Sequence, residues 1–401
     1  MPDGNEGKGR IKTLALTALF WLPLLSGVLS RAFKLSKWFG DYGAIACAAE
    51  KHLIGEPIYD RALECADVHN VVYVYHPIIA ETFAWLLERL GQSGLLMAYA
   101  GVFAAAVAAL IWIAIGRTGR GPRSKRAWFA AFITGSAIYW GNIAVILHAL
   151  LGVFALTLRR RPSLLVLAIA VAVVVKPLFA GFAVVFLLMR RRLFARALYA
   201  LAAVALGAAP SVWTLWQGGE LAVQWRALIE YYVYIDRPGE AYLGWMSAIG
   251  APVASLGVSI GYLAFAGAMA LAGIVLAEGL ELDDEARVLL GLSLGVLLIP
   301  RLMAQDYWLL GPGLLALAAA ISEKAPGAGR LLERALLSVC VLALVGNLAD
   351  LADYTSRLAT LSLSLIVVCT AAWALVAGRA NLARIWGGLI KGSSTPSATL
   401  G

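Results

Sequence analysis

The fold of this chain is decided by two apolar stretches with basic ends, RAWFAAFITGSAIYWGNIAVILHALLGVFALTLR (Arg126–Arg159) and RPSLLVLAIAVAVVVKPLFAGFAVVFLLMR (Arg161–Arg190). Because Lys and Arg favour the cytoplasmic side of a membrane, both ends of each stretch are expected inside, and each stretch must form a hairpin. The first is interrupted at Asn142 and the second at Lys176. The hairpin arms are about 13 to 17 residues long, short of the roughly 20 needed to cross a bilayer core. Asn142 and Lys176 are therefore expected at the outer tips of short helices, at the mouth of a cavity.

Composition places the chain in a membrane. Hydrophobic residues make up 61% of its 401 positions and charged residues 14%, against about a quarter in soluble domains. The apolar runs lack the alternation of an outer-membrane barrel. We therefore expect an all-α, polytopic integral membrane protein. The net charge of +9 resides largely in short loops between spans, where it sets topology and contacts lipid headgroups, so no nucleic acid is expected.

Hydropathy with basic flanks held inside predicts about twelve transmembrane helices and two cytoplasmic termini. The expected spans are 12–33, 94–116, 127–140, 142–158, 163–175, 177–189, 194–216, 254–277, 287–300, 306–321, 331–347 and 360–378. The first apolar segment follows basic residues and lacks a cleavage site, so it reads as a retained anchor. We expect one transmembrane domain over residues 1–391 in the inner (plasma) membrane, a disordered tail over 392–401, and a monomer.

Two outer segments, 34–93 and 217–244, are too long to be turns. The first contains two amphipathic candidates, Asp41–Leu53 and Pro77–Leu90, which suit helices lying at the interface. It also contains two of the four cysteines, Cys47 and Cys65. A disulfide between them and two free thiols both remain open at this point.

Aromatic residues concentrate on the expected outer side, and Tyr42 and Trp245 are among them. A belt of aromatic residues would decorate both interfaces about equally. The asymmetry favours a surface for carbohydrate or lipid headgroups, although a belt around protruding helices would also account for it.

A set of polar residues on the same outer side could carry chemistry. The sequence has no phosphate-binding Gly-rich motif and no Cys/His cluster with metal-ligand spacing. Its two G-x-S-x-G patterns lie inside apolar spans, where small residues serve close helix packing. What remains is a group of acids, bases and amides: Asp41, Tyr42, Glu50, His76, Asn142, Lys176, Arg226, Arg301 and Asp306. A carboxylate in such a group can accept a proton from a hydroxyl, and cations can hold a phosphate as it departs.

Four segments of the first half resemble glycosyltransferase family 87 of the GT-C superfamily. They are WFGDYGAIACAAEKHLIGEPIYD (Trp38–Asp60), VYVYHPIIA (Val72–Ala80), YWGNIAVILHALLGVFAL (Tyr139–Leu156) and VVKPLFAG (Val174–Gly181). After Arg190 the resemblance thins to GWMSAIG (Gly244–Gly250) and IPRLMAQDYW (Ile299–Trp308).

The resemblance implies an integral-membrane transferase of the GT-C type that takes a sugar, usually mannose, from a polyprenyl phosphate. Its site would open on the outer face, and Asp41 would be the base that activates a glycolipid or glycan acceptor. Two departures concern the sugar and the acceptor: His76 stands where the family often has Pro, and Asp306 stands where His is common.

Under this hypothesis Lys176 and Arg301 hold the donor phosphate. The residues expected to bind substrate are Tyr42, His76, Asn142, Trp245 and Asp306. The scheme requires no cofactor and no metal, because the protein supplies the cations that face a single phosphate.

Other interpretations stay open. Asp41 could be a helix-capping acid, Lys176 a residue that reaches from the apolar region to the interface, and His76 a structural side chain. The whole chain could be a lipid or sugar transporter or flippase, for which broken helices are also typical. A ligase with a diphosphate-linked donor is a third alternative, and it would require more outer Arg residues.

Overall fold

The computed structural model describes residues 4–33, 38–65, 68–117 and 123–391. It is 80% helical, which confirms the expected all-α class. Six helices are long and apolar enough to cross a membrane, so the chain is a polytopic helical membrane protein. They are α1 (Gly4–Phe33), α3 (Pro77–Ile111), α9 (Leu193–Gln217), α12 (Leu256–Gly279), α15 (Pro326–Leu348) and α16 (Ala352–Val376). The tail 392–401 and the middle of the basic loop 117–126 lie outside the described residues.

Shorter apolar helices pack among these six. They are α6 (Ile143–Thr157), α7 (Pro162–Val175), η3 (Pro177–Ala183), α8 (Val184–Leu188), α13 (Asp284–Leu297), η5 (Ala304–Leu309) and α14 (Leu310–Lys324). Helix α6 begins directly after Asn142 and α7 ends directly before Lys176. The two interruptions expected from the sequence are therefore confirmed as helix ends. Pro177 explains the second, because a proline restricts the residue before it to extended backbone.

Residues 127–140 were expected to form one helical arm, and this prediction is wrong. They form a 3-10 helix, η2 (Trp128–Phe132), then the extended residue Ile133 and a single turn, α5 (Ser136–Tyr139). Irregular backbone is tolerated at membrane depth only where protein covers it. Here the side-chain amide of Asn347 donates to the carbonyl of Ala131 over 2.8 Å, and the segment packs between α1 and α15.

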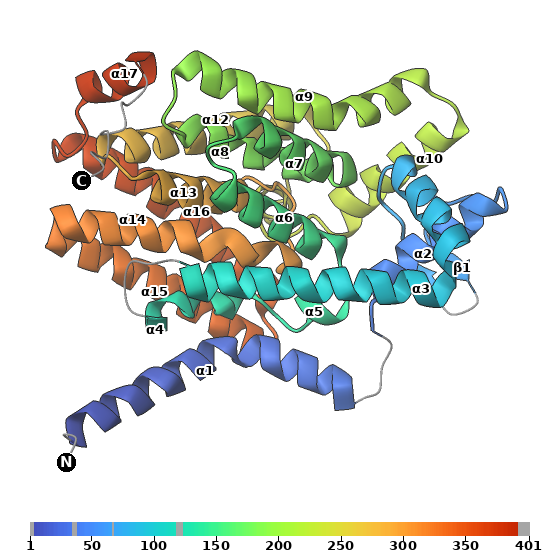
Figure 1. Cartoon of the computed structure of the whole chain (residues 1–401), viewed down its shortest axis with the longest axis horizontal. Coiled ribbons are helices and arrows are strands. Elements are labelled where there is room, and N and C mark those ends of the chain that lie inside the picture. The colour runs from blue at the N-terminus through green and yellow to red at the C-terminus, as the bar shows by residue number, and fades with distance from the viewer. Residues whose placement is uncertain (1–3, 34–37, 66–67, 118–122, 392–401) are drawn as a thin grey trace, which may run out of the picture.

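Element α3 is broken at Gly91, whose φ of 66° and ψ of 171° are not helical. The part before Gly91 corresponds to the expected interfacial helix 77–90, and the part after it begins the expected span 94–116, so the separation expected from the sequence is confirmed. The first part turns away from the second and lies with α2 at one end of the molecule (Figure 1).

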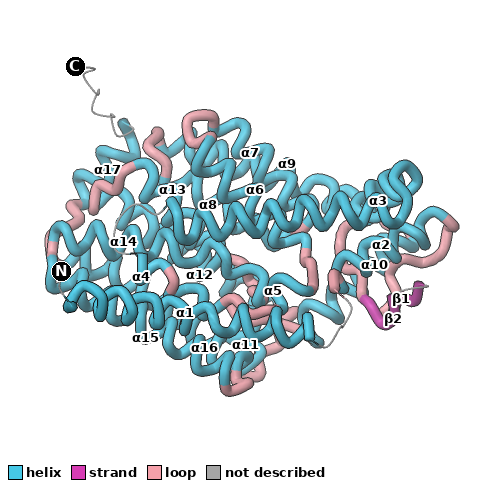
Figure 2. The backbone as a smooth tube through the Cα atoms, turned by 60° about the horizontal axis from the view of Figure 1, so that its bottom comes forward, coloured by secondary structure: helices cyan, strands magenta, loops and turns pink. Residues whose placement is uncertain are grey.

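The elements expected outside gather at one end of the molecule (Figure 1). They are α2 (Gly40–Leu53), β1 (Leu63–Cys65), β2 (Val68–Val71), α10 (Glu220–Ile229) and η4 (Glu230–Asp236), whereas α11 (Tyr242–Ala248) lies closer to the middle of the molecule, beside α16 (Figure 2). The antiparallel pairing of β1 with β2 was not foreseen. A disulfide joins Cys47 of α2 to Cys65 of β1, which settles the question that the sequence left open.

The starts of α1 and of α17 (Leu382–Lys391) lie at the opposite end, and the tube view shows the same separation (Figure 2). The remaining elements are η1 (Trp112–Arg117) and α4 (Arg123–Arg126). Both lie in the same half of the molecule as the start of α1 (Figure 1).

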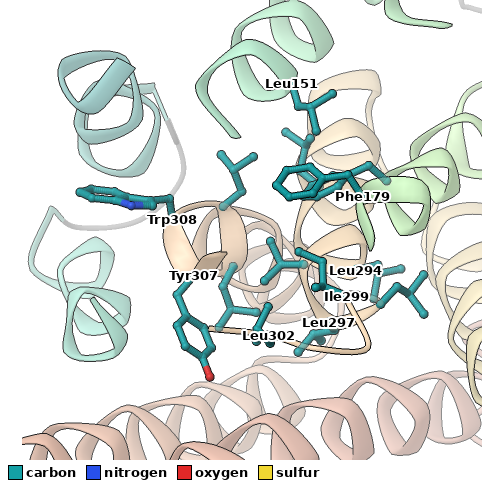
Figure 3. Packing of buried hydrophobic residues seen from close by; sticks show 14 of the residues in the cluster. Leu151, Phe179, Leu294, Leu297, Ile299, Leu302, Tyr307 and Trp308 are labelled. Carbon is teal, nitrogen blue, oxygen red and sulfur yellow. The ribbon is translucent and has the colours of Figure 1, made fainter. Parts of the chain in front are cut away.

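The core between the two ends is a continuous cluster of buried apolar side chains (Figure 3). Leu151 of α6, Phe179 of η3, Leu294 of α13 and Trp308 of η5 all belong to it. The close approach depends on small residues, since a Cβ at Gly295 would lie 2.5 Å from the ring of Phe182. This supports helix packing as the role of the second G-x-S-x-G pattern.

Candidate functional site

Asp41 is held in the first turn of α2 by the tip of the first interrupted stretch. The amide of Phe39 donates to the carbonyl of Tyr139 over 2.8 Å, and the amide of Asp41 donates to the carbonyl of Trp140 over 2.9 Å. Phe39, the N-cap of α2, has left-handed backbone with a φ of 61°. The outer segment that follows the first span is thus fixed to the tip about a hundred residues further along the chain.

Asn142 connects that tip to the Asp41 carboxylate. Its Oδ1 accepts from the amide of Ala144 over 2.9 Å, so it caps α6. Its Nδ2 donates to Oδ2 of Asp41 over 2.7 Å. Gly141 has a φ of +62°, which suits glycine in this tight tip, and its carbonyl accepts from the hydroxyl of Tyr99. Asn142 therefore orients the carboxylate and satisfies one of its oxygens.

The surroundings of Asp41 have opposing effects on its acidity. Burial raises the pKa of Asp41 above its ordinary value, because the ionised form loses hydration. The hydrogen bond from Asn142 and the positive charges of Lys176, Arg237 and Arg301 lower the pKa and offset part of this effect. A carboxylate with a raised pKa accepts a proton more readily than an exposed aspartate does.

Lys176 and Asp306 form an ion pair at the tip of the second interrupted stretch. Nζ of Lys176 lies 3.0 Å from Oδ1 and 3.3 Å from Oδ2 of Asp306. The lysine side chain is 12% exposed and the aspartate fully buried. Oδ2 of Asp306 also accepts from the amide of Met303. Asp306 therefore fixes Lys176, while Lys176 keeps a small exposed surface.

Arg301 lies in the loop between α13 and η5 and supplies a second cation. Its Nε donates to the carbonyl of Arg237 over 2.6 Å, and its guanidinium lies 5.5 Å from the ring centroid of Tyr232. Neither of its two Nη groups has a hydrogen-bond partner in the part of the chain that the structure describes. The flat edge of the guanidinium therefore retains donors that could bind an anion in bidentate fashion.

These separate tips converge on one region. The charges of Lys176 and Arg301 act on Asp41, and the charge of Asp306 acts on Arg301, although the residues are spread from position 41 to position 306. Sequence reasoning missed Tyr75, whose hydroxyl feels the charges of both Asp41 and Asp306. Burial holds the pKa of Tyr75 far above its ordinary value, so its hydroxyl remains a donor.

Two other expected site residues, Tyr42 and His76, make their contacts within the protein. Tyr42 packs against the ring of Tyr99 at 4.7 Å between centroids. His76 caps α3 through Nδ1, which accepts from the amide of Ile78, and its Nε2 lies 3.0 Å from Oγ1 of Thr214. Both ring nitrogens of His76 are thus used in local structure.

Trp245 lies in α11, away from the Asp41 tip in sequence and in its contacts. Its Nε1 donates to the carbonyl of Arg357 and to Oγ1 of Thr360, and its ring contacts Tyr242 and Phe265. Two polar residues of the outer side, Glu50 and Arg226, are engaged with Gln92 and with Glu230 at exposed positions.

Glu240 is an acid near the candidate site that sequence reasoning also missed. It lies in the loop before α11, and its amide donates to the carbonyl of Leu302 next to Arg301. The only sequence signal was an acid after Pro238-Gly239 in an outer segment, which is too common to single it out. Glu240 can be recognised as part of the candidate site only from the structure, in which its loop packs against residues 300–302.

No protein-family model, no curated protein and no solved structure matches this chain.

Proposed function

We propose that the chain is an inverting glycosyltransferase that moves a hexose from a polyprenyl phosphate to a lipid-linked or glycan acceptor on the outer face. The observation that carries the proposal is the convergence of Asp41, Lys176 and Arg301, which come from three distant segments and lie close enough for both cations to act on the carboxylate. A base and two cations are the groups that such a displacement requires. The resemblance to glycosyltransferase family 87 supports mannose as the sugar.

In the proposed reaction, Asp41 accepts the proton of the acceptor hydroxyl as its oxygen forms a bond to the anomeric carbon. The bond between that carbon and the phosphate oxygen breaks, and its electron pair leaves with the polyprenyl phosphate. The negative charge that develops on the phosphate is stabilised by Arg301 and Lys176. The carboxylate and the cations act from fixed positions, so reorganisation costs little.

The two cations have unequal roles. Lys176 is already neutralised by Asp306 at 3.0 Å, so this pair contributes a hydrogen-bond donor and little net charge. Arg301 has no carboxylate partner among the described residues. We therefore assign it most of the attraction for the phosphate, with the hydroxyl of Tyr75 as a further donor.

We further propose about twelve membrane crossings of the GT-C type, with both termini in the cytoplasm and the site outside. The positive-inside pattern supports this arrangement. The grouping of α2, the β-hairpin and α10 at the end opposite the start of α1 also supports it (Figure 1).

Single-cysteine labelling tests this topology. Asp60 and Arg160 are both exposed and lie in the expected outer and inner segments. In a background in which Cys340 and Cys369 are Ser, Asp60→Cys should react with a membrane-impermeant maleimide in intact cells or spheroplasts. Arg160→Cys should react only after permeabilisation. Labelling of Arg160→Cys in sealed cells would overturn the proposed orientation.

The activity is tested with a strain that lacks the protein. Mass spectrometry of its lipids and glycans should find one product that lacks a single hexose and a corresponding acceptor that accumulates. Purified protein with a polyprenyl-phosphate hexose should then add the hexose to that acceptor. If the strain instead retains complete product and accumulates a lipid on the inner leaflet, the transporter interpretation replaces the transferase.

A further inference from the structure

Glu240 belongs to a loop that is built onto the phosphate side of the candidate site. Its amide donates to the carbonyl of Leu302 over 2.8 Å, while Nε of Arg301 donates to the carbonyl of Arg237. Gly239 has a φ of +82°, and a Cβ there would lie 2.7 Å from the carbonyl oxygen of Leu302. The close approach therefore requires glycine, and it fixes Glu240 beside Arg301.

Hydrogen-bond donors contact both the side chain and the backbone carbonyl of Glu240. Oε2 accepts from the hydroxyl of Tyr307 over 2.5 Å, and the backbone carbonyl of Glu240 accepts from Oγ1 of Thr360. The Ser356 side chain also bonds the carboxyl group. The hydroxyl of Tyr307 points away from the apolar cluster that holds its ring (Figure 3). Tyr307 thus connects Glu240 to the element that carries Asp306.

The charges around Glu240 make its ionisation sensitive to a further anion. Burial and the negative charges of Asp353 and Asp306 raise the pKa of Glu240, hydrogen bonds from Tyr307 and Ser356 lower it, and the net result is a pKa of about 7. The positive groups in and around this loop are Arg237, Arg301 and Arg357. The Nε of Arg357 lies 3.3 Å from the carbonyl of Gly239. A carboxyl group with a pKa near 7 is about half ionised at neutral pH.

We propose that Glu240 takes up a proton when an anionic phosphate binds beside Lys176 and Arg301, so that donor binding and protonation of Glu240 are coupled. The added negative charge disfavours the Glu240 carboxylate, and by linkage a group that gains a proton on binding makes the ligand bind more tightly as the pH falls. The inference rests on the proposed function, because it takes the phosphate of the donor as the anion.

The test measures proton uptake directly. The full-length protein in detergent is titrated with a polyprenyl-phosphate mannose, without acceptor, at pH 7 in two buffers of different ionisation enthalpy. The diester is the suitable probe, because a phosphate monoester itself titrates near pH 6. The difference between the two calorimetric heats gives the number of protons taken up. If donor binding raises the Glu240 pKa by one unit, about 0.4 proton is bound, and affinity rises about fivefold between pH 8 and pH 6.

Glu240→Gln keeps an oxygen that can accept from Tyr307 and removes the titration, so uptake should fall by about 0.4 proton relative to the wild type. Glu240→Asp should restore part of it. Glu230→Gln, which alters an exposed carboxyl paired with Arg226 in the same outer segment, should leave uptake unchanged. Asp41 also contributes uptake, so the difference between wild type and Glu240→Gln is the decisive quantity.

Two outcomes separate this inference from the proposed function. Donor that binds with the same proton uptake in wild type and Glu240→Gln overturns the role of Glu240 and leaves the transferase standing. Donor that does not bind the wild-type protein at all overturns the transferase. If Glu240→Gln fails to fold, Asp41→Asn decides, because it removes the contribution of Asp41 and should still take up about 0.4 proton; donor binding to this variant without proton uptake contradicts the coupling.

Discussion

Purified Asp41→Asn is expected to transfer hexose about 10²–10⁴-fold more slowly than the wild type, because loss of a general base typically has an effect of this size. The variant should fold normally. Asn142 donates through Nδ2 to Oδ2 of Asp41, and an asparagine oxygen at position 41 can accept the same hydrogen bond. Initial rates at saturating donor and acceptor are the measurement, with donor binding measured separately so that a loss of chemistry is distinguished from a loss of affinity.

Acids of the same outer segment provide matched controls for Asp41→Asn. Glu50 bonds to Gln92, Glu56 pairs with Lys51, and Asp60 accepts from its neighbouring amide. Their amide variants should retain most of the activity. If Asp60→Asn or Glu50→Gln abolished transfer while Asp41→Asn did not, the base would have to be reassigned.

The wild-type rate should also fall at acid pH as Asp41 is protonated. Since burial raises the pKa of Asp41, this decline should begin at higher pH than for an ordinary aspartate. The base form is present above that pKa and is lost as the pH falls through it.

The sequence was sufficient to predict the interruptions that carry the site. Asn142 and Lys176 stand out because polar residues in apolar stretches require a helix end or a partner. The structure confirms both helix ends, and the Asn142 cap follows from the ordinary chemistry of asparagine at that position. The signals at Asn142 and Lys176 are local, so they could be detected without knowledge of the partners.

The errors and omissions depend on packing between distant segments. Residues 127–140 are as apolar as a helical arm, and only the cover from α1 and α15 makes an irregular backbone acceptable there. Tyr75 lies in a segment that resembles the family, but nothing local distinguishes it from the neighbouring tyrosine Tyr73, and Glu240 has no distinctive neighbours in sequence. Both matter because of distant charges: Asp41 and Asp306 act on Tyr75, and Asp353 and Asp306 act on Glu240. No local pattern reports such long-range contacts.

Arg301→Ala is expected to reduce transfer about 10²–10³-fold, the effect of removing one donor to a developing oxyanion. The structure gives the reason: Nε is used by the Arg237 carbonyl, and the two Nη groups retain donors for the phosphate. Arg301→Lys keeps the charge and loses the planar fork, so a loss of roughly tenfold is expected. Lys176→Ala should also weaken donor use, because it removes a donor and leaves the buried Asp306 carboxylate uncompensated near the phosphate.

The measurement for Arg301 is the dependence of rate on the concentration of polyprenyl-phosphate hexose at saturating acceptor. Arg226→Ala removes an exposed arginine of the same outer half, paired with Glu230, and serves as the control. Guanidinium added to Arg301→Ala should recover part of the rate, which a purely structural defect in the Arg237 loop would not allow. If Arg301→Ala and Lys176→Ala both left the kinetics for the donor unchanged, the phosphate would have to bind elsewhere, and these two cations would serve only to stabilise the loops they contact.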